Sequence, residues 1–104
     1  MMTYELIKSI LDELGLEYAY YEFKKKPTGD KYIVYFESEK VRFLADDKVY
    51  NYEPQFALEL YTKTKDIATE TALINLFDEN EVVWSGGESS YIDSEQIWQT
   101  VFYI

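Results

Sequence analysis

The side chains that most often carry out chemistry in proteins are missing from this chain. Its 104 residues include no Cys and no His, so its own residues cannot form a Ser-His or Cys-His nucleophile or a His- or Cys-ligated zinc site. Carboxylates, hydroxyls and amines remain. We therefore predict that the chain is not an enzyme, unless acidic clusters supply the chemistry.

Two groups of acids have the composition that such chemistry would need. Asp46 and Asp47 are adjacent, and Asp78, Glu79 and Glu81 lie close together in the sequence. Neighbouring residues of a strand point to opposite faces, so the first pair could act together only in a turn. The second group lacks the Gly and the closing Glu of a calcium-binding EF-hand loop. We interpret both groups as solvated charge and predict no metal and no cofactor.

Two further patterns are superficially those of phosphate-binding sites. Lys24, Lys25 and Lys26 form a basic run that is shorter than the basic patches that bind nucleic acids. Gly86 and Gly87 are not followed by the Lys of a phosphate-binding loop or by a helical pattern. We predict a solvated turn at the lysines and a flexible loop at the glycines.

The charge balance is strongly acidic. Ten basic and twenty acidic residues give a net charge of −10, and from Asp66 onward there are eight acids and no base. Nucleic-acid affinity depends on Lys and Arg, so we expect no tight nucleic-acid binding. No apolar run approaches the roughly 20 residues of a membrane span, so we expect a soluble protein without membrane contact.

The length and periodicities predict one domain over residues 1–104 and an α+β fold. Apolar residues at helical spacing indicate helices near residues 4–14 and 66–79. Strands are expected over residues 16–23, 31–37, 41–45, 48–52, 55–62, 82–85 and 96–104. The first two strands should form a long hairpin, and the third and fourth a short appended one. The order α-β-β-(β-β)-β-α-β-β predicts a mainly antiparallel sheet with both helices packed on one face.

Aromatic residues are more numerous than a small core easily buries, with 11 Tyr, 6 Phe and 2 Trp. One interpretation is that half of them form the core and the others are scattered on the surface. The other is that several Tyr form a protein–protein interface, where Tyr and Trp are enriched. The candidate interface residues are Tyr50, Tyr52 and Tyr91.

Several short segments, taken in order, suggest a family. They are the opening helix that ends at Gly15, residues 18–23, Tyr32-Ile33-Val34-Tyr35, Ala45-Asp46, Leu58-Glu59-Leu60-Tyr61-Thr62 with Lys65-Asp66 and Glu70, and the terminal strand over residues 98–103. In this order and spacing the chain resembles the small tail-completion or tail-terminator proteins of long-tailed bacteriophages. The resemblance covers nearly the whole chain.

The resemblance implies a structural role in the virion, with assembly in the host cytoplasm. Such proteins form a ring, typically of six copies, at the head-proximal end of a completed tail tube. The ring stops polymerisation of the tube and offers a surface to the head connector protein. The implied partners are therefore other copies of the chain, the tail tube protein and the head connector, and the family has no catalytic residue or cofactor.

In the implied ring, acidic residues would line the passage for DNA, because an acidic wall does not adhere to DNA. We expect Glu37, Glu39, Asp46 and Asp47 on exposed loops, some of them facing the ring lumen. The net charge also fits a different class of protein. An acidic binding module, such as an inhibitor that mimics DNA and occupies a DNA-binding enzyme, remains the alternative.

Overall fold

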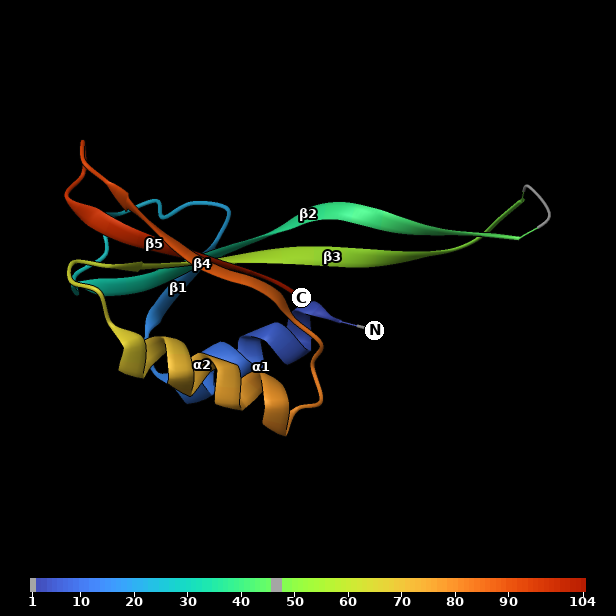
Figure 1. The fold of residues 1–104 in the computed structure, drawn as a ribbon, viewed down its shortest axis with the longest axis horizontal. Coiled ribbons are helices and arrows are strands. Elements are labelled where there is room, and N and C mark those ends of the chain that lie inside the picture. The colour runs from blue at the N-terminus through green and yellow to red at the C-terminus, as the bar shows by residue number, and fades with distance from the viewer. Residues whose placement is uncertain (1, 46–47) are drawn as a thin grey trace.

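The structure, a computed structural model, describes the chain over residues 2–45 and 48–104, and side chains over residues 2–38 and 55–104. Two helices and five strands form an α+β fold, as predicted, with both helices on the same side of the sheet (Figure 1). The elements are α1 (Tyr4–Leu14), β1 (Glu17–Tyr20), β2 (Lys31–Ala45), β3 (Lys48–Thr62), α2 (Ile67–Glu79), β4 (Ser85–Ile92) and β5 (Ile97–Tyr103).

Both helices begin and end where the sequence predicts. The Thr3 side chain caps α1 by accepting a hydrogen bond from the Leu6 amide, and Gly15 ends the helix with φ 82°, a left-handed conformation that glycine adopts without strain. Asp66 caps α2 by accepting from the Thr69 amide. The buried helix residues are Ile7, Ile10 and Leu11 of α1 and Leu73, Leu76 and Phe77 of α2.

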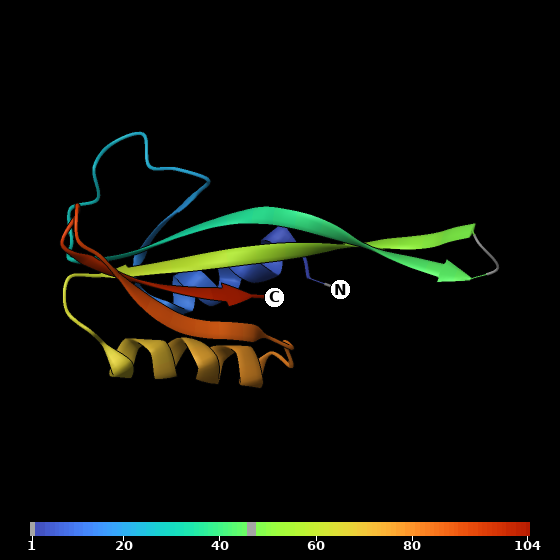
Figure 2. The same ribbon diagram turned by 45° about the horizontal axis from the view of Figure 1, so that its top comes forward.

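The sheet has the order β1-β2-β3-β5-β4 and is antiparallel except between β1 and β2. The predicted hairpin of these two strands is therefore wrong, because Glu17 pairs with Tyr32 and Tyr20 with Tyr35 in parallel. Residues 21–30 form a crossover that arches over the face of the sheet opposite α2 (Figure 2). The Glu17 carboxylate fixes this crossover by accepting hydrogen bonds from the Thr28 hydroxyl and from the Thr28 and Gly29 amides. The bond from the Thr28 hydroxyl, followed by those from the amides, lowers the pKa of Glu17.

Strands β2 and β3 are each 15 residues long, and they replace the four shorter strands that were predicted over residues 31–62. They pair from Lys31 with Thr62 to Ala45 with Lys48. Register shifts after Glu37 and Phe43 absorb the irregular positions as bulges instead of ending the strands. The appended hairpin is thus the continuation of the central one, and it carries the molecule to a length of 49 Å (Figure 1).

Strand β4 occupies the place where a flexible loop was predicted at Gly86 and Gly87. Both glycines have positive φ, 86° and 84°, and the pairing with β5 shifts register between Gly86 and Glu88. A glycine bulge of this kind lets a strand bend and continue. The two glycines, which predicted a loop, therefore form the bulge of an irregular strand.

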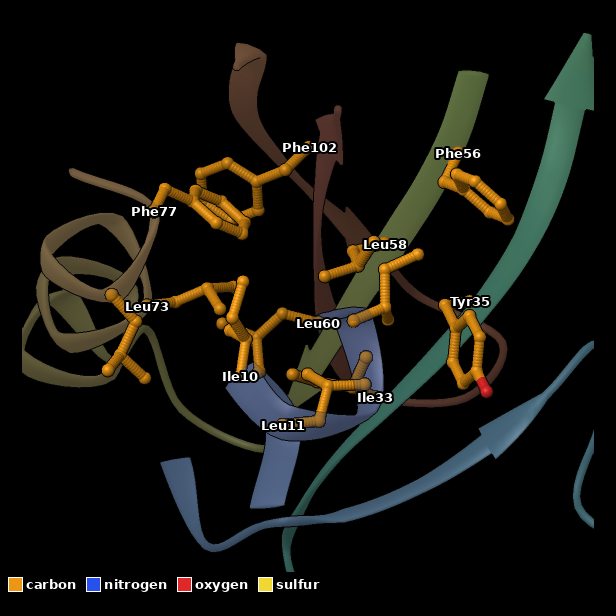
Figure 3. Packing of buried hydrophobic residues seen from close by; sticks show 12 residues of the cluster. Ile10, Leu11, Ile33, Tyr35, Phe56, Leu58, Leu60, Leu73, Phe77 and Phe102 are labelled. Atoms are coloured by element: carbon orange, nitrogen blue, oxygen red, sulfur yellow. The ribbon is translucent and has the colours of Figure 1, made fainter. Parts of the chain in front are cut away.

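The hydrophobic core lies between the two helices and one face of the sheet (Figure 3). Leu58 and Leu60 of β3 lie at its centre, each 1% exposed, and the helices cover them from one side. The other labelled core residues in Figure 3 are Ile10, Leu11, Ile33, Tyr35, Phe56, Leu73, Phe77 and Phe102.

None of the described helices is long and apolar enough to cross a membrane.

Candidate assembly surface

The far part of the β2–β3 hairpin, residues 39–55, projects beyond the rest of the sheet, and we call it the arm. Strand β1 pairs with β2 only as far as Tyr35, and β5 pairs with β3 only from Ala57. Within the described residues, both outer edges of the arm therefore have no neighbouring strand. A two-stranded ribbon is marginally stable by itself, and unpaired edges readily accept another strand. The arm is the part of the fold that most needs a partner.

A half-exposed group of tyrosines lies at the base of the arm. The Tyr4 hydroxyl donates to Glu37 Oε2 at 3.1 Å and lies 3.3 Å from the Tyr20 hydroxyl. The Tyr4 ring meets Phe56 edge-on with a centroid distance of 5.0 Å. Tyr4 and Tyr20 are 39% and 46% exposed. We call Tyr4, Tyr20 and Glu37 the root cluster.

The hydroxyl of Tyr4 in the root cluster is held in its protonated form. The hydrogen bond with Tyr20, then burial and the hydrogen bond with Glu37, raise the pKa of Tyr4 well above its ordinary value, so this hydroxyl stays protonated and donates. Tyrosines of this kind offer a large flat surface and a polar tip at little cost in side-chain entropy. This combination is enriched in protein–protein interfaces.

The structure corrects the placement of two predicted acids. Glu37 and Glu39 were expected on exposed loops, but both belong to β2. The strand continues through them because β2 stays paired with β3 across a bulge between Glu37 and Glu39. At this bulge the Ser38 hydroxyl donates to the Gln55 carbonyl at 3.1 Å. Asp46 and Asp47 lie outside the described residues.

The candidate interface aromatics have different outcomes. Tyr50 and Tyr52 belong to β3, but their side chains lie outside the described ones. Tyr91 is on the outermost strand β4, 45% exposed, and packs against Trp98 of β5 with a centroid distance of 5.3 Å. The structure thus brings Glu37 together with Tyr4 and Tyr20, which were not among the candidates. Tyr91 lies on β4, the edge strand farthest from β1.

A polar network lies on the sheet face away from the helices. The Tyr61 hydroxyl donates to Glu59 Oε1 at 3.0 Å and accepts from Gln99 Nε2 at 2.9 Å. Its ring stacks on Tyr32 with centroids 5.1 Å apart, and burial is the main cause that raises the pKa of Tyr61 to about 12. The sequence signal was the alternation of Glu59 and Tyr61 with the core leucines, but nothing in the sequence placed Gln99 beside them.

The acidity is concentrated where few bases are near. Lys31 forms an ion pair with Asp66, and Lys65 with Glu70, so the start of α2 is compensated. Hydrogen bonds with Lys31 and Thr69 lower the pKa of Asp66 to about 2. Further along the chain, six acids are exposed at the end of α2, just after it, on β4 and in the turn between β4 and β5. They are Asp78, Glu79, Glu81, Glu88, Asp93 and Glu95.

A hollow with both apolar and polar walls lies at the end of the sheet opposite the arm. It has a volume of about 340 Å³ and is lined in part by Tyr32, Lys26, Lys63, Asp30 and Glu95. Its two lysines and two acids balance, and Lys63 lies 3.7 Å from Asp30. Among the described residues, no group of three or more acids could hold a metal ion.

No protein-family model matches the chain, and no curated protein is significantly similar to it. The features that bear on function are therefore the arm, the root cluster and the distribution of acids.

Proposed function

We propose that this chain is a structural protein of a long-tailed phage or prophage, which caps the completed tail tube as a ring and helps to join the tail to the head. The arm is the observation that carries the proposal. A compact α+β body with a hairpin that, in the part of the chain the structure describes, pairs with no further strand on either edge has the form of a subunit that completes its sheet on a neighbour. The resemblance to tail-terminator proteins supplies the biological setting.

The two sides of the sheet differ, which supports a head-to-tail arrangement of copies. The arm continues the β2–β3 side of the sheet, whereas β4 is the last strand on the other side. A contact that joins two different surfaces of one chain is heterologous, and it closes into a ring when its rotation divides the circle. A ring can then present one face to the tube protein and the other to the head connector.

The charge of the molecule suits a passage for DNA. Six acids are exposed between Asp78 and Glu95, and the net charge is −10. An acidic wall repels the phosphate backbone, so DNA would pass without adhering. We propose that part of this acidic surface faces the ring lumen.

The test is tail length in particles made without this protein. Deletion of the gene from the phage that encodes it should give overlong or headless tails in electron micrographs, because nothing stops polymerisation of the tube. A complementing copy of the full chain should restore normal particles. A copy in which a short Asn-Gly turn replaces residues 40–54 should not restore them. Tails of normal length joined to heads in the deletion would contradict the proposal.

The exposed acids also favour a second candidate, an acidic module that mimics DNA. Such a protein would occupy the DNA-binding surface of an enzyme and displace DNA in a salt-sensitive way, because charge would supply most of its affinity. Competition between the purified chain and labelled DNA on a panel of restriction enzymes and polymerases separates the candidates. Displacement that weakens with salt would support the mimic; a tail terminator should displace nothing.

A further inference from the structure

We infer that the arm binds a second copy of the chain by adding the outer edge of β2, along residues 39–45, to the outer edge of β4 in that neighbour. The inference rests on the proposed function only in that copies assemble with one another. It deepens the proposal by naming the two surfaces that meet.

The backbone decides which edge of the arm is available. The Phe56 amide and carbonyl both bond to Ile104, so Phe56 directs its polar groups to the outer edge of β3. Successive residues of a strand direct these groups to opposite sides, so residues two apart direct them to the same side. Pro54 therefore faces the same edge as Phe56, and proline has no N–H to donate there. The outer edge of β3 is thus interrupted, whereas residues 39–45 of β2 contain no proline.

The sheet offers one long edge to receive it. Strand β1 is only four residues long, and short edge strands resist further pairing. Strand β4 is eight residues long and carries no Lys or Pro. Beyond its glycine bulge, residues 88–92 pair with β5 without a further register shift, so this part of the edge lacks Lys, Pro and bulges, with which natural sheets protect an edge. Its Ser85, Glu88, Ser90 and Tyr91 are exposed, so another strand could approach it.

Charge selects between the ways in which copies could pair. The β2 part of the arm contains Lys40 and Arg42 against a single acid, Glu39. Strand β4 contains Glu88 and no base, and the turn after it adds Asp93 and Glu95. One base, Lys65, reaches this strand from the chain before α2, where it donates to Ser89 and pairs with Glu70. Two β2 edges side by side would bring Lys40 and Arg42 of both copies together, and two β4 edges would bring their acids together. The β2 edge on β4 joins opposite charges, so these residues disfavour symmetric pairing and favour the head-to-tail one.

Cross-linking locates the contact directly. The chain has no Cys, so single introduced thiols are the only reactive ones. We would mix an Arg42→Cys copy with a Ser90→Cys copy and treat them with a short bismaleimide. The matched control replaces the second partner with Lys8→Cys, on the exposed face of α1.

We expect the R42C–S90C product to exceed the R42C–K8C product by about tenfold, because docking raises the effective concentration of the two thiols. Equal yields, or no R42C–S90C product at the highest protein concentration reached, would overturn the inference. The tail-length assay reads the capping function independently. Overlong tails in the deletion together with equal cross-linking yields would leave capping supported and this contact wrong.

Charge reversal tests the selectivity. Sedimentation equilibrium should show a dissociation constant about tenfold higher for K40E/R42E than for the wild type. Mixing K40E/R42E with E88K should recover part of the affinity. The control K24E/K25E makes the same charge change in the exposed crossover and should change affinity little. Equal weakening by both double variants, with folding confirmed by circular dichroism, would overturn the inference.

Discussion

At the scale of single residues, Tyr61 contacts three other side chains on the sheet face away from the helices. Its hydroxyl is both donor and acceptor, between Glu59 and Gln99. Polar groups of this kind fix one arrangement of neighbouring strands, because any other register leaves a partly buried group without its partner. The network therefore helps to set the register of β3 against β5.

Replacing Tyr61 with Phe should lower the free energy of unfolding by about 1–2 kcal/mol, since Glu59 and Gln99 each lose a hydrogen bond while the stacked ring stays. Urea unfolding followed by fluorescence gives this value as a shift of the midpoint. The control is Tyr21→Phe, at a side chain that is 69% exposed, where we expect a change below about 0.5 kcal/mol. Equal effects of the two variants would contradict the role of the network.

Asp66 links stability to pH. Its pKa falls from an ordinary 3.8 to about 2 in the folded protein. A carboxyl whose folded pKa is depressed stabilises the fold above its unfolded pKa and loses that contribution as the pH falls toward the folded value. The window is therefore from about pH 4 down to about pH 2.

Asp66→Asn keeps the helix cap but loses the ion pair with Lys31. The side chains of Asp66 and Lys31 are 16% and 46% exposed, so screening by solvent limits the loss to about 1 kcal/mol at pH 6. The difference between wild type and variant should shrink to near zero by pH 2. Urea unfolding at a series of pH values measures it, and a difference that is constant across that range would show that the ion pair is not the cause.

At the scale of elements, the fold depends on irregular strands. The glycine bulge of β4 keeps this strand paired to β5 as it bends, and the two bulges of the β2–β3 pair let it run unbroken into the arm. Because these bulges let β2 and β3 extend beyond their neighbouring strands, they also leave the edges of the arm exposed. Assembly on a neighbour would then be a consequence of strand length rather than of a separate docking motif.

Gly86→Ala should be strongly destabilising because two effects add. The residue has φ 86°, and an added Cβ would lie 2.6 Å from the Val101 carbonyl oxygen; together we expect a loss of about 3 kcal/mol. Gly15 has φ 82° but nothing within 4 Å of an added Cβ, so Gly15→Ala measures the backbone strain alone, about 1 kcal/mol. Thermal unfolding compares the two. A loss no greater at Gly86 than at Gly15 would contradict the close packing of β4 on β5.

At the scale of the whole molecule, net charge opposes the association that the arm promotes. Each copy carries −10, so copies repel over distances of about a Debye length, roughly 10 Å at 0.1 M salt. The contact between arm and β4 is local, whereas this repulsion involves the entire surface. Salt should therefore weaken the repulsion more than it weakens the contact.

Self-association of the purified chain should rise as salt increases from about 0.01 M to about 0.2 M. Light scattering or sedimentation velocity at fixed protein concentration measures it. The K40E/R42E variant should associate less than the wild type at every salt concentration. If association of the wild type fell steadily with salt, attraction between the two edges would outweigh the net charge, and this prediction would be wrong.

The sequence by itself determined the helices, the fold class and the charge. Thr3, Gly15 and Asp66 are local signals for helix ends, and the spacing of apolar residues along α1 reports which face is buried. Along α2 the same spacing includes Ile67, which is 68% exposed. The alternation of Leu58 and Leu60 with Glu59 and Tyr61 likewise predicted a strand with one buried face. These are properties of neighbouring residues, so no tertiary contact was needed to infer them.

Only the tertiary structure decided how the strands pair. Alternation in β1 and β2 is compatible with parallel or antiparallel neighbours, and the parallel choice depends on contacts such as that of Glu17 with the crossover. Bulges after Glu37 and at Gly86 resemble strand ends in the sequence, because residues that break local regularity also form loops. The arm and the root cluster arise from these long-range choices. For this reason Glu37, which was predicted where a strand ends and an exposed loop begins, is found inside β2 beside Tyr4.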